Sequence, residues 1–265
     1  GHAPVGLGAM KVAAFDFDGT LHHPPHGFDP ADIAAIDAWR QAGHLAISAT
    51  GRSRTALAQA MTGSGLAFDY QVLSNGASAT DGANRELIFG HEISGDILRA
   101  VLAEFGDRDG LAIFGTTLGR TDGVFANNTA RTHTFTAHFA PMRIDDIPHH
   151  QFAVIPIWVP DDAGLRAEVV SWATTLGSVE VAQNQDYIDL MAPGRSKGFG
   201  IQELFGVLGI DRSDVELYTF GDSWNDLTMH ALADHSHSFP HSPADVQAAT
   251  NRVIGSVSEV LGGYM

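Results

Sequence analysis

The chain has 265 residues and a formal net charge of −16, with 44% hydrophobic and 17% charged residues. These values are typical of a soluble globular protein with room for two modest domains. An acidic surface repels nucleic-acid phosphates and anionic lipid, so we expect neither a nucleic acid nor a membrane as partner. The sequence has no cysteine, which excludes disulfides, thiolate chemistry and cysteine-based zinc sites and is compatible with the cytoplasm, our expected location.

Residues 1–9 have the character of an expression scar, with Met10 as the natural start. An apolar run at residues 12–15 then predicts a buried parallel strand. Asp29 is placed to cap a helix, with Pro30 at its first position. Two more apolar runs, at residues 44–48 and 70–73, predict further strands and thus a β-α-β arrangement.

The middle of the chain changes character. Helical patterns cover residues 94–105 and 163–176, and strand-like runs surround them. Those runs are residues 111–114, 152–155, 179–181 and 187–190. Helices and strands mixed in this way predict an α+β domain inserted from residue 80 to residue 191.

The first pattern returns after the insertion. Ser196 is placed to cap a helix that runs to Leu208, and residues 216–220 predict another buried strand. Shorter elements are expected at residues 236–239, 243–250 and 252–260. We therefore predict an α/β protein whose parallel-sheet core combines residues 10–79 and 192–265. Ligands of such sheets bind beyond the carboxyl ends of the strands.

The run from Asp16 to Thr20 carries two carboxylates just past the first predicted strand. Because strand side chains alternate, Asp16 and Asp18 can point the same way. A carboxylate can attack phosphorus when the phosphoryl charge is neutralised, so Asp16 is our candidate nucleophile. Asp18 is placed to protonate the leaving oxygen and later to activate water. The alternative is a solvated turn after a strand.

A second acidic run follows the strand predicted at residues 216–220. If that strand lies beside the first, Asp222 and Asp226 converge with Asp16 and Asp18. Such a cluster cannot stay ionised without cations. Oxygen ligands of this kind suit Mg²⁺, which also binds substrate phosphate.

Two further residues suit an anionic substrate. Lys197, at the start of the helix predicted after Ser196, supplies a fixed positive charge where helix amides also favour anions. Thr50 ends the second predicted strand and offers a hydroxyl beside free amides at the start of a helix. Taken separately, Lys197 reads as a surface lysine and Thr50 as an ordinary helix cap.

In this order, the four pieces resemble the motifs of the haloacid dehalogenase superfamily of phosphohydrolases. The matches are Asp16 to Thr20 for the first motif, Thr50 for the second, Lys197 for the third, and Gly221 to Asp226 for the fourth. Residues 49–52, 74–77 and 196–198 resemble the Cof-like subgroup with a large inserted cap (type IIB). The resemblance implies a Rossmann-like parallel core, with a cap that closes over it.

The resemblance also implies a magnesium-dependent phosphatase with an aspartyl-phosphate on Asp16. The metal site would comprise Asp16, the backbone carbonyl of Asp18, Asp222, and Asp226, which would hold the metal's waters or Lys197. The phosphoryl group would be held by Thr50, Gly51, Lys197, Asn225 and the backbone amide of Phe17. The substrate would be a small phosphorylated metabolite, with sugar phosphates favoured, because a closed cap leaves no room for a polymer.

The chain departs from that subgroup after the fourth motif, where a Gly-rich stretch is usual. Here it carries His235, His237 and His241, which we interpret as loop or strand-surface residues in preference to a second metal site. His22 and His23 lie just after the nucleophile loop and could touch substrate, but we favour a linker role for them. Trp224 is bulky for its place in the motif.

A polar stretch of the predicted cap is a weaker candidate for contact with the leaving group. It comprises Arg120, Asp122, Asn127, Asn128 and Arg131. Most such stretches are solvated loops, so these residues are not assigned to the site.

Two other functions remain open at this stage. One is a phosphomutase or phosphotransferase on the same scaffold, and the other is a phosphate-binding regulator without turnover. The full set of charged groups that the reaction requires argues against the regulator. A monomer is the default expectation.

Overall fold

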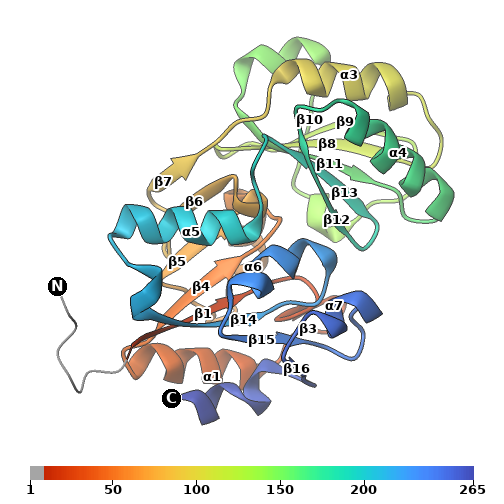
Figure 1. Ribbon diagram of the computed structural model, residues 1–265. Helices are drawn as coiled ribbons and strands as arrows, with labels where there is room; N and C mark the ends of the chain where they lie inside the picture. Colours follow the sequence, from red (N-terminus) through yellow and green to blue (C-terminus); the bar gives the residue numbers. More distant parts are fainter. Residues whose placement is uncertain (1–8) are drawn as a thin grey trace.

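The computed structural model describes residues 9–265, and its larger sheet is built from both ends of the chain (Figure 1). In spatial order the strands are β16 (Arg252–Val253), β15 (His235–Ser238), β14 (Val215–Phe220), β1 (Met10–Phe15), β4 (Leu45–Ala49), β5 (Tyr70–Leu73), β6 (Ser78–Asp81) and β7 (Leu87–Gly90). From β16 to β5 all neighbours pair in parallel. The predicted parallel core is therefore confirmed, with β1 and β14 side by side.

Helices cover both faces of this sheet, as parallel strands require. The helices of the core are α1 (Pro30–Gln41), α2 (Arg54–Met61), α5 (Lys197–Leu208), α6 (Leu227–Leu232) and α7 (Ala244–Ala248). Alternate β1 residues serve opposite faces: Phe15 joins the cluster of Trp39, and Val12 joins that of Ile201. Figure 1 shows α1 and α5 on opposite sides of the sheet.

Local signals explain where these helices begin and end. The Asp29 side chain accepts a hydrogen bond from the Ala31 amide, so α1 begins at Pro30 as predicted. Ser196 accepts from the Phe199 amide at the start of α5. Gly209 ends α5, because its backbone is in the left-handed conformation that commonly terminates helices.

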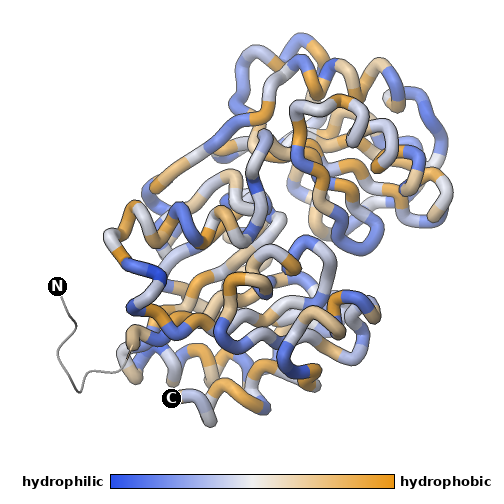
Figure 2. Tube along the Cα trace, in the orientation of Figure 1, coloured by the Kyte–Doolittle hydropathy of each residue, from blue (hydrophilic) through white to orange (hydrophobic). Residues whose placement is uncertain are grey.

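The second sheet forms the cap. Its strands are, in spatial order, β10 (Ala140–Pro141), β9 (Gly123–Asn127), β8 (Ala112–Thr117), β11 (Phe152–Trp158), β13 (Tyr187–Met191) and β12 (Glu180–Asn184). All neighbours pair antiparallel except β10 with β9. The helices α3 (Gly95–Phe105) and α4 (Ala163–Thr175) share one apolar cluster with this sheet. Apolar stretches follow the strands of both sheets, as Figure 2 shows.

The chain leaves the core sheet later than residue 80, where the boundary between core and cap was expected. The strands β6 and β7 pair antiparallel onto β5 and extend the core sheet to Gly90. We therefore propose that the cap begins after Gly90. The short hairpin of β2 (His22–His23) and β3 (Gly27–Phe28) follows the first motif. No helix within residues 9–265 is long and apolar enough to cross a membrane.

A tight turn after β5 fixes the core against α5. Gly76 has a φ of +86°, and a Cβ there would overlap the Ser196 carbonyl oxygen. Only glycine fits this combination of left-handed backbone and close approach. The turn is thereby pressed against the start of the helix that carries Lys197.

We predict that Gly76→Ala lowers the free energy of unfolding by about 2–5 kcal/mol, because the methyl group must displace backbone atoms. Gly43→Ala is the matched control: Gly43 has a φ of +90° but open space around its Cβ position. The control should cost only about 1–2 kcal/mol, the penalty of the left-handed backbone. Denaturant unfolding measures both, and equal losses would contradict the steric argument.

Candidate active site

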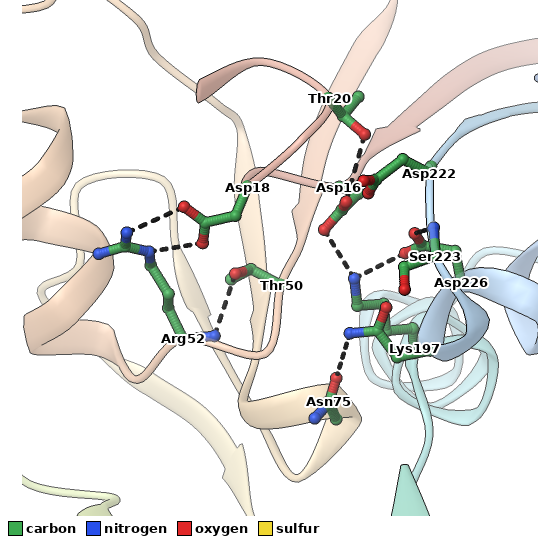
Figure 3. A network of polar contacts seen from close by, with 12 residues as sticks. Asp16, Asp18, Thr20, Thr50, Arg52, Asn75, Lys197, Asp222, Ser223 and Asp226 are labelled. Carbon is green, nitrogen blue, oxygen red and sulfur yellow. Dashed lines mark hydrogen bonds and ion pairs between the residues drawn. The ribbon is translucent and has the colours of Figure 1, made fainter. Parts of the chain in front are cut away.

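Asp16 lies at the carboxyl end of β1 and is only 2% exposed. Its backbone N–H donates to the Phe220 carbonyl at 2.8 Å, which joins the ends of β1 and β14. Thr20 Oγ1 donates to Asp16 Oδ2 at 3.2 Å, and Lys197 Nζ donates to Asp16 Oδ1 at 2.8 Å (Figure 3). Two donors on different oxygens therefore fix the orientation of this carboxylate.

The structure brings three of the four predicted carboxylates together. Oxygens of Asp16, Asp222 and Asp226 all lie within 4.8 Å of one another, and all three side chains are buried. The approach depends on Gly19, with a φ of +85°, because a Cβ there would overlap Asp222 Oδ2. The sharp turn and the missing side chain both require glycine at this position.

The chemistry of this cluster fits a divalent cation. Burial raises the pKa of Asp222 well above its usual range, and the nearby charge of Asp16 raises it further. Burial and Asp16 also raise the pKa of Asp226, against the opposing effect of Lys197. Among the described residues, Asp222 Oδ1 is buried without a hydrogen-bond partner. A bound cation would keep all three groups ionised, and oxygen donors suit Mg²⁺.

Lys197 is the first residue of α5 and is fully buried. Its Nζ donates to Asp16 at 2.8 Å and to Asp226 at 2.6 Å. Burial lowers the pKa of Lys197, but attraction by Asp16 and Asp226 outweighs burial and holds that pKa above its usual value. The ammonium group is therefore charged, and the surface-lysine interpretation is wrong.

The Asp18 side chain stays outside the cluster, unlike the expected convergence of four carboxylates. Its Oδ2 accepts from Arg52 Nε at 2.7 Å and its Oδ1 from Arg52 Nη2 at 2.9 Å. His22 Nδ1 lies 3.1 Å from Oδ1. Burial raises the pKa of Asp18, but His22 and Arg52 outweigh it and hold that pKa far below its usual range. Figure 3 shows the carboxylate directed towards Arg52.

The predicted phosphate-binding residues come from separate loops. Thr50 follows β4 and is buried, and with Gly51 it lines the cavity described below. The next helix begins at Arg54 with Ser53 as its cap, so Thr50 is not a helix cap. Thr50 Oγ1 instead accepts from the Arg52 amide at 3.0 Å.

Asn225 and Phe17 complete the predicted set. Asn225 is 7% exposed and donates through Nδ2 to Asn75 Oδ1 at 3.1 Å. Phe17 is buried, and its ring stacks on the His22 ring at 5.1 Å. Asn75, which the motifs did not assign to the site, thus contacts it directly.

A cavity of about 380 Å³ lies over these loops. The core lines it with Asp16, Asp18, Gly19, His22, His23, Pro24, Thr50, Gly51, Arg52 and His241, and the cap with His133, Phe135, Asn184, Gln185, Tyr187 and Asp189. This size suits a small metabolite. Burial raises the pKa of Asp189 to about 7, although a hydrogen bond from Asn75 opposes the shift.

The polar cap stretch singled out in the sequence does not line this cavity. Arg120 donates to the Asn84 carbonyl, and Asp122 accepts from Ser53 Oγ at 2.5 Å. The cap residues that do line it were missed, because they come from two separate segments. The one available signal was the turn-forming run from Asn184 to Asp186 between two predicted strands.

The histidines that the sequence analysis singled out divide into two groups. His235 and His237 belong to β15, where His237 is buried and stacks on Phe220 at 4.3 Å. His22, His23 and His241 line the cavity, so the linker role expected for the first two is wrong. His241 Nε2 lies 2.9 Å from the Gly19 carbonyl oxygen.

Residues 13–262 match the family model of haloacid dehalogenase-like hydrolases. The HMP-PP phosphatase of Cronobacter sakazakii is 28% identical over 229 residues, which cover 84% of this chain and 81% of that protein. The HMP-PP phosphatase of Serratia proteamaculans is 24% identical, and the match covers 85% of this chain and 82% of that protein.

Solved structures agree with the fold. A sugar phosphatase of the haloacid dehalogenase subclass IIB superposes with a TM-score of 0.81 at 20% identity, covering 96% of this chain and 99% of that one. A Cof-like hydrolase from Plasmodium vivax superposes with a TM-score of 0.82 at 18% identity, covering 97% of this chain and 96% of that one. The chain therefore belongs to the haloacid dehalogenase-like hydrolases.

Proposed function

We propose that this hydrolase is a phosphatase, which removes a phosphoryl group from a small metabolite through an aspartyl-phosphate on Asp16. The observation that carries the proposal is the position of the Asp16 carboxylate. It lines the cavity and is held by Lys197 on one oxygen and Thr20 on the other. A nucleophile held in one orientation beside a buried cation suits attack on phosphorus.

The proposed reaction has two steps. An Asp16 oxygen attacks phosphorus, the bond from phosphorus to the leaving oxygen breaks, and the Asp18 carboxyl donates its proton to that oxygen. The Asp18 carboxylate then takes a proton from water, whose oxygen attacks phosphorus. The Asp16–phosphorus link breaks, and phosphate leaves with Asp16 restored.

The ion pair of Asp18 with Arg52 sets a condition on the first step. Arg52 and His22 stabilise the carboxylate form of Asp18, which cannot donate a proton. We propose that Asp18 leaves Arg52 when substrate enters and then takes up a proton from solvent, which it donates to the leaving oxygen. Both side chains line the cavity, beside the space that the substrate would enter.

We propose Mg²⁺ as the cofactor, held by the side chains of Asp16, Asp222 and Asp226 and the backbone carbonyl of Asp18. When bound, it supplies positive charge that neutralises the acidic cluster and the substrate phosphate. The phosphoryl oxygens would be held by Thr50, Gly51, Lys197, Asn225 and the Phe17 amide.

For the substrate we propose a metabolite with a ring at its far end, with HMP-PP as the first compound to test and sugar phosphates as the second. The names of the two curated relatives support the former. The cap wall supports a ring: Tyr187 packs edge to face with His133 at 5.7 Å and with Phe135 at 5.5 Å. Tyr187 Oη and Asn184 Oδ1 are buried without hydrogen-bond partners in the described residues, so each can serve a polar ligand atom.

We predict that Asp16→Asn lowers kcat at least about a thousandfold, because the amide oxygen is a poor nucleophile. Phosphate release from p-nitrophenyl phosphate measures the loss. Asp37→Asn is the control, since Asp37 is an exposed residue of α1 whose side chain accepts a hydrogen bond from Gln41 in the same helix. Turnover by Asp16→Asn within about tenfold of wild type would mean that the nucleophile is misassigned.

We predict that EDTA abolishes turnover and that Mg²⁺ restores it. Mg²⁺ should also raise the unfolding temperature, because a ligand that binds only the folded state stabilises it. Asp222→Asn should lose this thermal shift. Metal-independent turnover, or a shift that survives in Asp222→Asn, would contradict the assigned site.

We predict that Tyr187→Phe raises KM for the preferred metabolite about 2- to 12-fold, which corresponds to the loss of one hydrogen bond. The measurement compares HMP-PP, a hexose phosphate and p-nitrophenyl phosphate under steady-state conditions. Tyr70→Phe in β5 is the control, since Tyr70 packs with the core sheet. An unchanged KM for every compound would remove Tyr187 from the leaving-group site.

A further inference from the structure

The turn between β5 and β6 has an unusual backbone. Ser74, Asn75 and Gly76 all have positive φ values, of 55°, 52° and 86°. Left-handed backbone at non-glycine residues persists only where the surroundings enforce it, and such turns gather at functional sites. Here two backbone hydrogen bonds to the second motif hold the turn in this conformation. The backbone N–H of Asn75 donates to the Thr50 carbonyl at 3.0 Å, and the backbone N–H of Ser74 donates to the Arg52 carbonyl at 2.9 Å.

The Asn75 side chain connects the cap to the fourth motif. It is 1% exposed, and its Nδ2 donates to Asp189 Oδ2 at 2.8 Å. Its Oδ1 accepts from Asn225 Nδ2 at 3.1 Å (Figure 3 labels Asn75). A Cβ on Gly51 would lie 3.4 Å from both Asn75 and Asp189, so the pair packs directly over the predicted phosphate loop.

This contact fixes the orientation of the Asn225 amide. A primary amide has two N–H donors and one oxygen acceptor. Asn75 takes one donor of Asn225, and Asn225 Oδ1 is buried without a partner among the described residues. The second N–H of Asn225 therefore has its direction set by Asn75.

We propose that Asn75 is a positioning residue, which orients Asn225 for the phosphoryl group and ties that orientation to the cap through Asp189. This inference rests on the proposed function, in which Asn225 binds the phosphoryl group. The chain of contacts runs from the cap strand β13, through the turn after β5, to the fourth motif. A cap that lifts away takes Asp189 with it and leaves the Asn75 donor without its partner.

An exchange of the two side chains tests this proposal. Asn75→Asp keeps an acceptor for Asn225 but removes the N–H that donates to Asp189 and sets a second carboxyl group against it. The double variant Asn75→Asp with Asp189→Asn restores one donor and one acceptor with their direction reversed. We expect kcat on p-nitrophenyl phosphate to fall at least about tenfold in Asn75→Asp and to recover at least about fivefold in the double variant.

Binding of inorganic phosphate gives a second readout that a purely structural role would not move. The inhibition constant for phosphate should rise in Asn75→Asp and recover in the double variant. The unfolding temperature of the double variant should stay near that of wild type. Recovery in neither kcat nor phosphate inhibition would overturn the proposal. A wild-type protein that does not hydrolyse p-nitrophenyl phosphate at all would instead overturn the proposed function.

Asn75→Gly covers the case in which Asn75→Asp fails to fold. Glycine accepts a φ of 52° and removes the whole Asn75 side chain, including its amide. The matched control is Ser74→Gly in the same turn, because Ser74 Oγ makes no hydrogen bond within the described residues. We expect kcat to fall at least about tenfold in Asn75→Gly and to stay within about threefold of wild type in Ser74→Gly. Equal effects of the two substitutions would reduce Asn75 to a structural residue of the turn.

Discussion

The contact on which the site depends is the buried ammonium of Lys197 between Asp16 and Asp226. A charged group taken out of water is stable only when its partners are close and well oriented, and removal of one partner leaves an uncompensated charge. The start of α5 and the loops after β1 and β14 must therefore meet at one point. Gly19 and Gly76 make that meeting sterically feasible, each where a Cβ would overlap a neighbouring segment.

Much of the core followed from local signals in the sequence. Local patterns predicted the strand β1, the capped helices α1 and α5, and the acidic residues after two strands. Strand ends and helix caps depend on a few consecutive residues, so a single sequence is enough to find them. A helix was expected directly after Thr50, but α2 begins at Arg54 with Ser53 as its cap, so the expected start was a few residues too early. The strands β6 and β7 were not predicted, and the boundary expected at residue 80 cuts through β6 and leaves β7 in the cap.

The rest of the site depends on contacts between distant segments. Arg52 and Asp18 lie 34 positions apart, and nothing in either local sequence indicates that they form an ion pair. The cap wall is similar, because its rings come from separate segments that meet only in the folded chain. His237 gave a misleading signal: a histidine-rich run suggested a loop or strand surface, yet its ring stacks within the core sheet.

The cap touches the reacting loops themselves. Arg52 lies with its guanidinium 4.8 Å from the Phe135 ring centroid, Ser53 donates to Asp122, and Asn75 donates to Asp189. Arg52 and Ser53 follow the predicted phosphate-binding residues Thr50 and Gly51 in the chain, and Asn75 accepts a hydrogen bond from Asn225. A change in the position of these cap residues therefore changes the contacts of the core loops directly, without intermediate residues.

The antiparallel hairpin of β6 and β7 has a consequence for the outside of the molecule. A parallel sheet that ended at β5 would present a row of free backbone groups to any passing strand. The hairpin covers that row, and its pairing is interrupted by a shift between Ala79 and Thr80. At the opposite margin β16 spans two residues. The short β16 and the irregular hairpin are features that make a sheet margin a poor template for intermolecular strand pairing.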